Sequence, residues 1–116
     1  MNVRIIYNPN VAENVLDDLA RELPVIIAEV LEVAGGKVAI LKRDQMALEF
    51  TQSSPRDTGA DIRIIVYARD VTPRTSTSEN QALTILDKIS PLVAASGSEY
   101  SVNVRLYYME IRAAEH

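Results

Sequence analysis

Cysteine is absent from the 116-residue chain, and histidine occurs only once, as the final residue His116. Without thiols the protein can form no disulfide, no thiolate metal site and no cysteine nucleophile. A Ser-His relay or a histidine-ligated zinc would have to recruit the last residue, and chain ends are often mobile. We therefore expect neither a metal nor a cofactor.

Aromatic side chains and positive charge are also scarce. The chain has no Trp and only 5% aromatic residues, and its 12 Lys and Arg against 16 Asp and Glu give a net charge of -4. Nucleic acids and anionic membranes require a cationic surface instead. No apolar run reaches the roughly 20 residues that span a bilayer, and the first residues lack the pattern of a signal peptide. We expect a cytoplasmic protein that binds neither nucleic acid nor a membrane.

The first half of the chain predicts a strand, a helix and a second strand. Residues 3–7 favour β-structure, and apolar residues recur at helical spacing from about 12 to 33, with Asn10 as the expected N-cap. Residues 38–41 predict a buried strand, and 47–50 could form a short strand within the polar stretch that follows. The apolar positions of the helix are Leu16, Leu19, Leu23, Ile26 or Ile27, and Val30.

The second half repeats this order. Residues 62–67 predict a strand, Ser76 and Glu79 have the spacing of a capping box before a helix that closes near Gly97, and residues 102–111 predict the last strand. The apolar positions of this helix are Ala82, Leu83, Leu86, Ile89 and Val93.

Short sequence matches support a duplication. Val-Arg-Ile-Ile at 3–6 returns as Ile-Arg-Ile-Ile at 62–65, and each predicted helix contains an internal proline, Pro24 and Pro91. A proline deep inside a helix costs about 3 kcal/mol or more, because it removes a hydrogen bond and clashes with the preceding turn. Finding it at matching places in both helices favours duplication over coincidence.

These observations predict one α+β domain over 1–116, with pseudo-repeats at about 1–45 and 61–112. Two βαβ units with right-handed crossovers give a mixed four-stranded sheet with two antiparallel helices on one face. The other face is then bare, although the neighbours Ile64 and Ile65, which point to opposite faces, are both apolar. Strands buried on both faces need a second layer, so we expect a homo-oligomer.

Three short segments, together with length and element order, match a known family. Asp44-Gln45-Met46 follows the predicted second strand, Arg74-Thr75-Ser76 leads into the second helix, and Tyr107-Tyr108 lies in the last strand. The chain resembles the tautomerase superfamily, in particular its fused-repeat members, macrophage migration inhibitory factor and the carboxymethyl-hydroxymuconate isomerases. The resemblance implies a homotrimer whose sheets enclose a central barrel, with active pockets between subunits.

The resemblance also implies a catalytic amino-terminal proline, which this chain lacks. In the family, burial lowers the pKa of the proline amine, so that it can move a proton between carbon atoms of an enol or dienol acid. Here residue 2 is Asn2, and a side chain of that size usually leaves Met1 in place. The base would then be a primary amine, displaced by one residue. We expect impaired or altered activity and assign no catalytic residue beyond the Met1 amine and the Asn2 position.

Three arginines and a tyrosine are the candidates for substrate binding. By resemblance, Arg69 and Arg74 would hold a substrate carboxylate, since a guanidinium can grip it through two parallel N–H donors. Arg43 could reach the same pocket, and Tyr107 could donate a proton or line the barrel. The structural alternatives are an ion pair of Arg69 with Asp70 or with an acid of a neighbouring subunit, a solvated Arg43, and a packing role for Tyr107.

Three functions remain open at this point. The first is a tautomerase- or isomerase-like protein for small enol or unsaturated carboxylates. The second is a non-catalytic homo-oligomer that binds a small acid or a protein partner. The third is a ferredoxin-like regulatory domain for small molecules, because βαββαβ order is shared by unrelated proteins. A trimer would favour the first two over the third, and proton exchange into a phenylenolpyruvate-type substrate would separate the first from the second.

Overall fold

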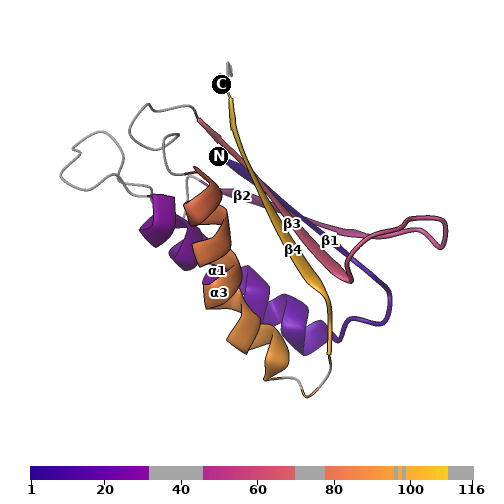
Figure 1. Cartoon of the computed structure of the whole chain (residues 1–116). Helices are drawn as coiled ribbons and strands as arrows, with labels where there is room; N and C mark the ends of the chain where they lie inside the picture. Colours follow the sequence, from indigo (N-terminus) through magenta and orange to yellow (C-terminus); the bar gives the residue numbers. More distant parts are fainter. Residues whose placement is uncertain (32–45, 70–77, 96, 98, 110–116) are drawn as a thin grey trace.

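The computed structural model describes residues 1–31, 46–69, 78–95, 97 and 99–109, with the side chains of Arg69 and Ser78 left out (Figure 1). The elements in chain order are β1 (Asn2–Tyr7), α1 (Glu13–Leu31), β2 (Ala47–Gln52), β3 (Ile62–Arg69), α3 (Ser78–Ala94) and β4 (Val102–Met109).

The four strands form one mixed sheet in the order β2-β1-β3-β4. β1 is parallel to β2, β3 is parallel to β4, and the two central strands β1 and β3 are antiparallel. Each helix therefore connects two adjacent parallel strands, and the two helices run in opposite directions on the same face of the sheet (Figure 1). The predicted α+β class, mixed sheet and helix placement are confirmed.

This sheet order also bears on the ferredoxin-like alternative. In a ferredoxin-like fold the two strands of each βαβ unit are split by a strand from the other unit. Here the two strands of each unit are direct hydrogen-bonded neighbours. The ferredoxin-like interpretation was therefore wrong as to fold.

The strand that completes the first unit is β2, which extends the short segment predicted at 47–50. It pairs with β1 in register from Asn2↔Ala47 to Tyr7↔Gln52. The strand predicted at 38–41 lies outside the described residues. Because β2 belongs to the first βαβ unit, that unit reaches Gln52 rather than ending near residue 45.

The core lies between the helices and one face of the sheet. Its buried side chains alternate along the central strands and recur at helical spacing in the helices. In α3 the prediction was partly wrong: Leu83 is 53% exposed, and Ile85, Ile89 and Val93 form the buried face. Leu83 is two positions before Ile85, a rotation of about 200°, so it lies on the other side of the helix. The buried core consists of Val3, Ile5, Val11, Val15, Leu16, Leu19, Leu23, Ile26, Ile27, Leu31, Ile62, Ile64, Val66, Ala68, Ile85, Ile89 and Val93.

The start of α1 is capped by Tyr100 and not by the side chain of Asn10. The backbone N–H of Ala12 donates to the Tyr100 hydroxyl at 3.1 Å, and that hydroxyl donates to the carbonyl oxygen of Asn10 at 3.1 Å. Tyr100 lies just before β4, so this contact fastens the beginning of the helix to the second half of the chain.

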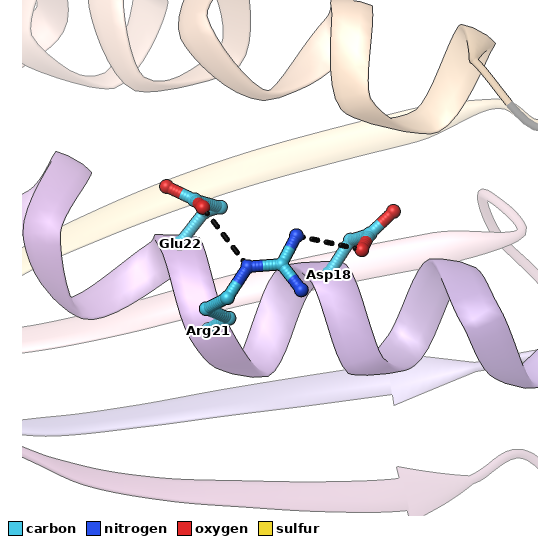
Figure 2. Close-up of polar contacts among 3 residues, drawn as sticks. All are labelled: Asp18, Arg21 and Glu22. Carbon is cyan, nitrogen blue, oxygen red and sulfur yellow. Dashed lines mark hydrogen bonds and ion pairs between the residues drawn. The ribbon is translucent and has the colours of Figure 1, made fainter.

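The exposed face of α1 carries local ion pairs (Figure 2). Arg21 lies between Asp18 and Glu22, with its Nη2 2.8 Å from Asp18 Oδ1 and its Nε 3.1 Å from Glu22 Oε1. The bond to Glu22, followed by the bond to Asp18, raises the pKa of Arg21. Among the described residues no three acidic or histidine side chains gather as a metal site. None of the described helices is both long and apolar enough to cross a membrane.

A chain of polar side chains crosses one end of the sheet in strand order. Ser53, after β2, donates its hydroxyl to Asn8 Oδ1 at 2.7 Å, and Asn8, after β1, donates its amide to Asp61 Oδ1 at 2.9 Å. Asp61, before β3, accepts the backbone N–H of Ser101 at 3.0 Å and its hydroxyl at 3.2 Å, just before β4. All four strands are therefore tied together at this end.

Replacing a core leucine should destabilise the protein far more than the same replacement on the surface. Leu23 is fully buried in α1, whereas Leu83 in α3 is exposed. We expect Leu23→Ala to lower the free energy of unfolding by about 2–5 kcal/mol, from lost burial and the cavity left behind, and Leu83→Ala to have a much smaller effect. Urea denaturation at one fixed protein concentration measures both, because assembly would add to apparent stability. Equal losses would contradict this description of the core.

The stability contributed by Asp61 should depend on pH. The backbone N–H of Ser101, followed by the side chains of Asn8 and Ser101, lowers the pKa of Asp61 below its ordinary value of 3.8. A carboxylate whose pKa is depressed in the folded state stabilises the fold above its unfolded pKa, and that contribution is lost as pH falls through the folded value. Asp61→Asn should therefore be less stable than the native chain at pH 7, with the difference shrinking below about pH 4.

Urea denaturation at a series of pH values tests this, with Ser101→Ala as the control. That variant keeps the backbone donor, the largest cause of the shift, so it should retain most of the pH dependence. An Asp61→Asn protein as stable as the native chain at every pH would show that the polar chain contributes nothing.

Candidate functional site

The helices that the structure describes do not cover the opposite face of the sheet, which we call the uncovered face. Ile65 points outward here, as the sequence predicts, but the strands alternate it with charged side chains, so this face is only partly apolar. Its aromatic and apolar positions are Ile6, Ile65, Tyr67, Tyr107 and Met109, and its polar positions include Asn2, Arg4, Glu49, Arg63, Asn103 and Arg105.

The beginning of β1 lies at one end of this face. Asn2 is exposed, and its partners in register are Ala47 on β2 and Tyr67 on β3. The backbone N–H of Ala47 donates to the carbonyl oxygen of Met1 at 3.0 Å, so the residue before the strand is also held in the sheet. A hollow of about 250 Å³ opens here, lined by Asn2, Val3, Arg4, Ala47, Glu49 and Tyr67.

Two tyrosines lie in the same row as Asn2, a row being the residues that are partners in register across adjacent strands. Tyr67 and Tyr107 are neighbours in register, and their rings are stacked with centroids 5.7 Å apart and planes at 17°. Tyr107 remains 42% exposed. Tyr108 is half-buried and donates its hydroxyl to Gln81 Oε1 on α3 at 2.5 Å. The sheet thus separates the Tyr-Tyr pair, and only Tyr107 shares a row with Asn2.

The predicted arginines are placed only in part. Arg69 ends β3 two residues beyond Tyr67, at the same end of the sheet as Asn2, and its backbone is in register with Met109. The side chain of Arg69 and all of Arg43 and Arg74 lie outside the described residues. Their roles in carboxylate binding remain predictions.

The structure adds Arg4 to this end of the face, a residue that the sequence prediction did not select. Arg4 Nη2 lies 3.7 Å from Glu49 Oε2 on the adjacent strand, and both side chains are exposed. An exposed pair at this distance contributes little to stability, so the guanidinium can exchange Glu49 for another carboxylate. The signal was present in the alternation of β1, which buries Val3 and Ile5 and so turns Arg4 outward beside Asn2.

These groups suit anion binding better than proton transfer. Arg4 supplies a cation, and Tyr67 supplies a ring and a hydroxyl at the same hollow. The nearby groups that could accept a proton are the carboxylate of Glu49 and the amino group of Met1. Asn2 has no basic nitrogen in its side chain, so the residue at the head of β1 brings a hydrogen-bonding amide and no base.

Solved structures share this fold over almost the whole chain. FG41 malonate semialdehyde decarboxylase, inhibited by 3-bromopropiolate, aligns with a TM-score of 0.67 at 15% identity, covering 95% of this chain and 84% of that chain. A wild-type fused 4-OT solved as a symmetric trimer aligns with a TM-score of 0.61 at 11% identity, covering 95% and 86%. N1, a member of the cis-3-chloroacrylic acid dehalogenase family, aligns with a TM-score of 0.60 at 11% identity, covering 96% and 75%.

No protein-family model matches the sequence, and no curated protein matches it either. At identities this low, structural likeness establishes the fold and leaves activity open. These neighbours are tautomerase superfamily members, as the element order and short segments of the sequence predict. The chain resembles the tautomerase superfamily and has a tautomerase-like fold.

Proposed function

We propose that the protein is a tautomerase-like homotrimer that binds small enol or unsaturated carboxylates, with isomerase activity impaired by Asn2. The observation that supports this most directly is the position of Asn2 at the head of β1, in a hollow that also contains the guanidinium of Arg4. The names of similar structures point to small acids as well, malonate semialdehyde and 3-chloroacrylic acid. In this site Arg4 binds the carboxylate, with Arg69, Arg74 and Arg43 as further candidates and Tyr107 as a proton donor or wall.

A non-catalytic binding protein is the second candidate, and Asn2 favours it. The hollow retains a cation for a small acid, whereas the position of the expected base holds an amide. Under this alternative the carboxylate binds and no proton is exchanged. The two candidates share a site and differ in one measurable step.

The proposal of a trimer is supported by the outward face of the sheet. Ile65, Tyr67 and Tyr107 lie on a surface that the chain's own helices do not cover. Similar fused 4-OT structures are named as symmetric and asymmetric trimers. Packing of three such faces around an axis would bury these side chains and place the hollow at Asn2 beside a neighbouring subunit.

Replacing Asn2 by proline should raise isomerase activity above that of the native chain. Proline at position 2 is small enough for the initiator methionine to be removed, which would expose a secondary amine at the head of β1. We expect Asn2→Pro to accelerate proton exchange into a phenylenolpyruvate-type substrate by at least about tenfold, which is less than the roughly 10²–10⁴-fold that a fully positioned general base contributes. Exchange can be followed by NMR in deuterated buffer, after mass spectrometry has confirmed the loss of Met1.

Asn2→Ala is the matched control for this experiment. It also permits methionine removal, but it exposes a primary amine. If Asn2→Ala gained as much activity as Asn2→Pro, the proline base would not be the missing component. If neither variant gained activity while both still bound the acid, the binding alternative would replace the isomerase.

The native chain should behave in solution as a particle with three times the 12.8 kDa mass of one chain. Ile65→Asp places a charge on the outward face of β3, where burial between subunits would make it costly, and should dissociate the trimer. Val25→Asp, at an exposed position of α1, should leave it intact. Light scattering after gel filtration gives the masses, with circular dichroism as a check on folding. A native monomer or dimer at micromolar concentration would refute the assembly.

A further inference from the structure

A second hollow lies on the uncovered face, at the opposite end of the sheet from Asn2. Its volume is about 340 Å³, and it is bounded by the loop at 58–60 and by Arg63, Asn103 and Arg105. No residue lines both this hollow and the one at Asn2. In register Arg63 pairs with Ile6 and Asn103, two rows away from the row of Asn2 and Tyr67. It is therefore a separate place on the molecule.

The two arginines of this hollow have few partners. Among the described residues, the buried Nε of Arg63 has no hydrogen-bond partner, and Arg63 Nη1 donates to the carbonyl oxygen of Thr58 at 3.4 Å. Within the part of the chain that the structure describes, neither Arg63 nor Arg105 forms an ion pair. Each guanidinium carries five N–H donors, and a buried donor without an acceptor is unfavourable. This cost applies to the buried Nε of Arg63, for which an anion would be a suitable acceptor, whereas Arg105 is exposed and contributes a second positive charge.

The acidic residues nearest to Arg63 in the sequence, Asp57 and Asp61, form hydrogen bonds with other residues. Asp57 accepts the backbone N–H of Ser54 at 2.9 Å, and Asp61 accepts bonds from Asn8 and Ser101. The chain has 16 acids and 12 basic residues, so a partner for each arginine would be easy to supply. The described residues that line the hollow nevertheless include two guanidiniums and no carboxylate.

Gly59 allows the loop to hold Arg63 in place. Its φ of +133° is rarely adopted by residues with side chains, and a Cβ there would lie 3.1 Å from Arg63 Cδ. The loop backbone therefore lies directly against the stem of Arg63. The guanidinium is restrained before any ligand arrives, which reduces the entropy lost on binding.

We propose that this second hollow binds a small oxyanion, a carboxylate or phosphate group, between Arg63 and Arg105. Guanidinium groups match both anions because each offers two parallel N–H donors. The amide of Asn103, between the two arginines in the sheet grid, is available as a further donor. The volume of this second hollow lies near the lower end of the range for ligand pockets, so the ligand is compact.

Calorimetric titration of the full chain with inorganic phosphate and with malonate tests this site, in chloride buffer of constant ionic strength. We expect saturable binding of one phosphate per chain at this hollow. Malonate can also bind at the hollow of Arg4, so only the part of its binding that is lost in Arg63→Gln and Arg105→Gln is assigned to this site. Arg63→Gln and Arg105→Gln should each weaken binding roughly tenfold or more, because hydrogen bonds to charged groups are strong. Arg56→Gln removes the same charge from an exposed position in the same loop and should leave the affinity unchanged.

A variant that leaves both arginines in place keeps the test decisive if Arg63→Gln fails to fold. Asn103→Asp introduces a carboxylate of nearly the same shape beside the guanidiniums and should abolish phosphate binding at this hollow, without changing the hollow of Arg4. The proposal is overturned if neither anion saturates, or if Arg56→Gln weakens binding as much as the two hollow variants. It is equally overturned if Arg63→Gln and Arg105→Gln change the mass of the assembly while the anion affinity stays at the native value.

Discussion

The alternation of side chains along the two central strands is the constraint on which the rest of the structure depends. Val3 on β1 and Ile64 on β3 are buried beneath the helices, so their neighbours Arg4 and Ile65 must lie on the other face. A slip of one residue would carry Arg4 into an apolar core, at the cost of burying an unpaired charge. The register is therefore strongly specified. It fixes which residues meet across the uncovered face, including the row that contains Asn2.

The two ends of the sheet differ in the described side chains that they carry. At one end the polar chain from Ser53 to Ser101 joins all four strands, and Gly59 in the loop before β3 presses against Arg63. At the other end β1 begins at Asn2, beside a hollow with an exposed ion pair that is easily exchanged. The end that carries the polar chain also carries Arg63 and Arg105. The family resemblance would place chemistry at the other end, at Asn2.

Much of the fold follows from the sequence, because helix periodicity and apolar strands are strong local signals. The exceptions have particular physical causes. β2 was weakly signalled because Ala47–Gln52 is an edge strand of alternating exposed and half-buried residues. The phase of α3 was misassigned at Leu83, since Ile85 also fits a helical apolar pattern and only packing decides between them. The cap on α1 comes from Tyr100, a contact far along the chain that no local motif can reveal.

Sequence alone placed Asn2 and Tyr107 among the site residues, but it could not assemble the site. Alternation along β1 already turns Arg4 outward, but only the register shows which residues of the other strands lie beside Arg4 and Arg105. The same geometry separates two functions that a tautomerase needs. In the proposed site, carboxylate binding would depend on arginines set by strand alternation, and proton transfer on the single residue at the head of β1. Such a chain could lose the second through Asn2 and keep the first, because nothing in the described core or in the pairing of the strands requires proline at that position.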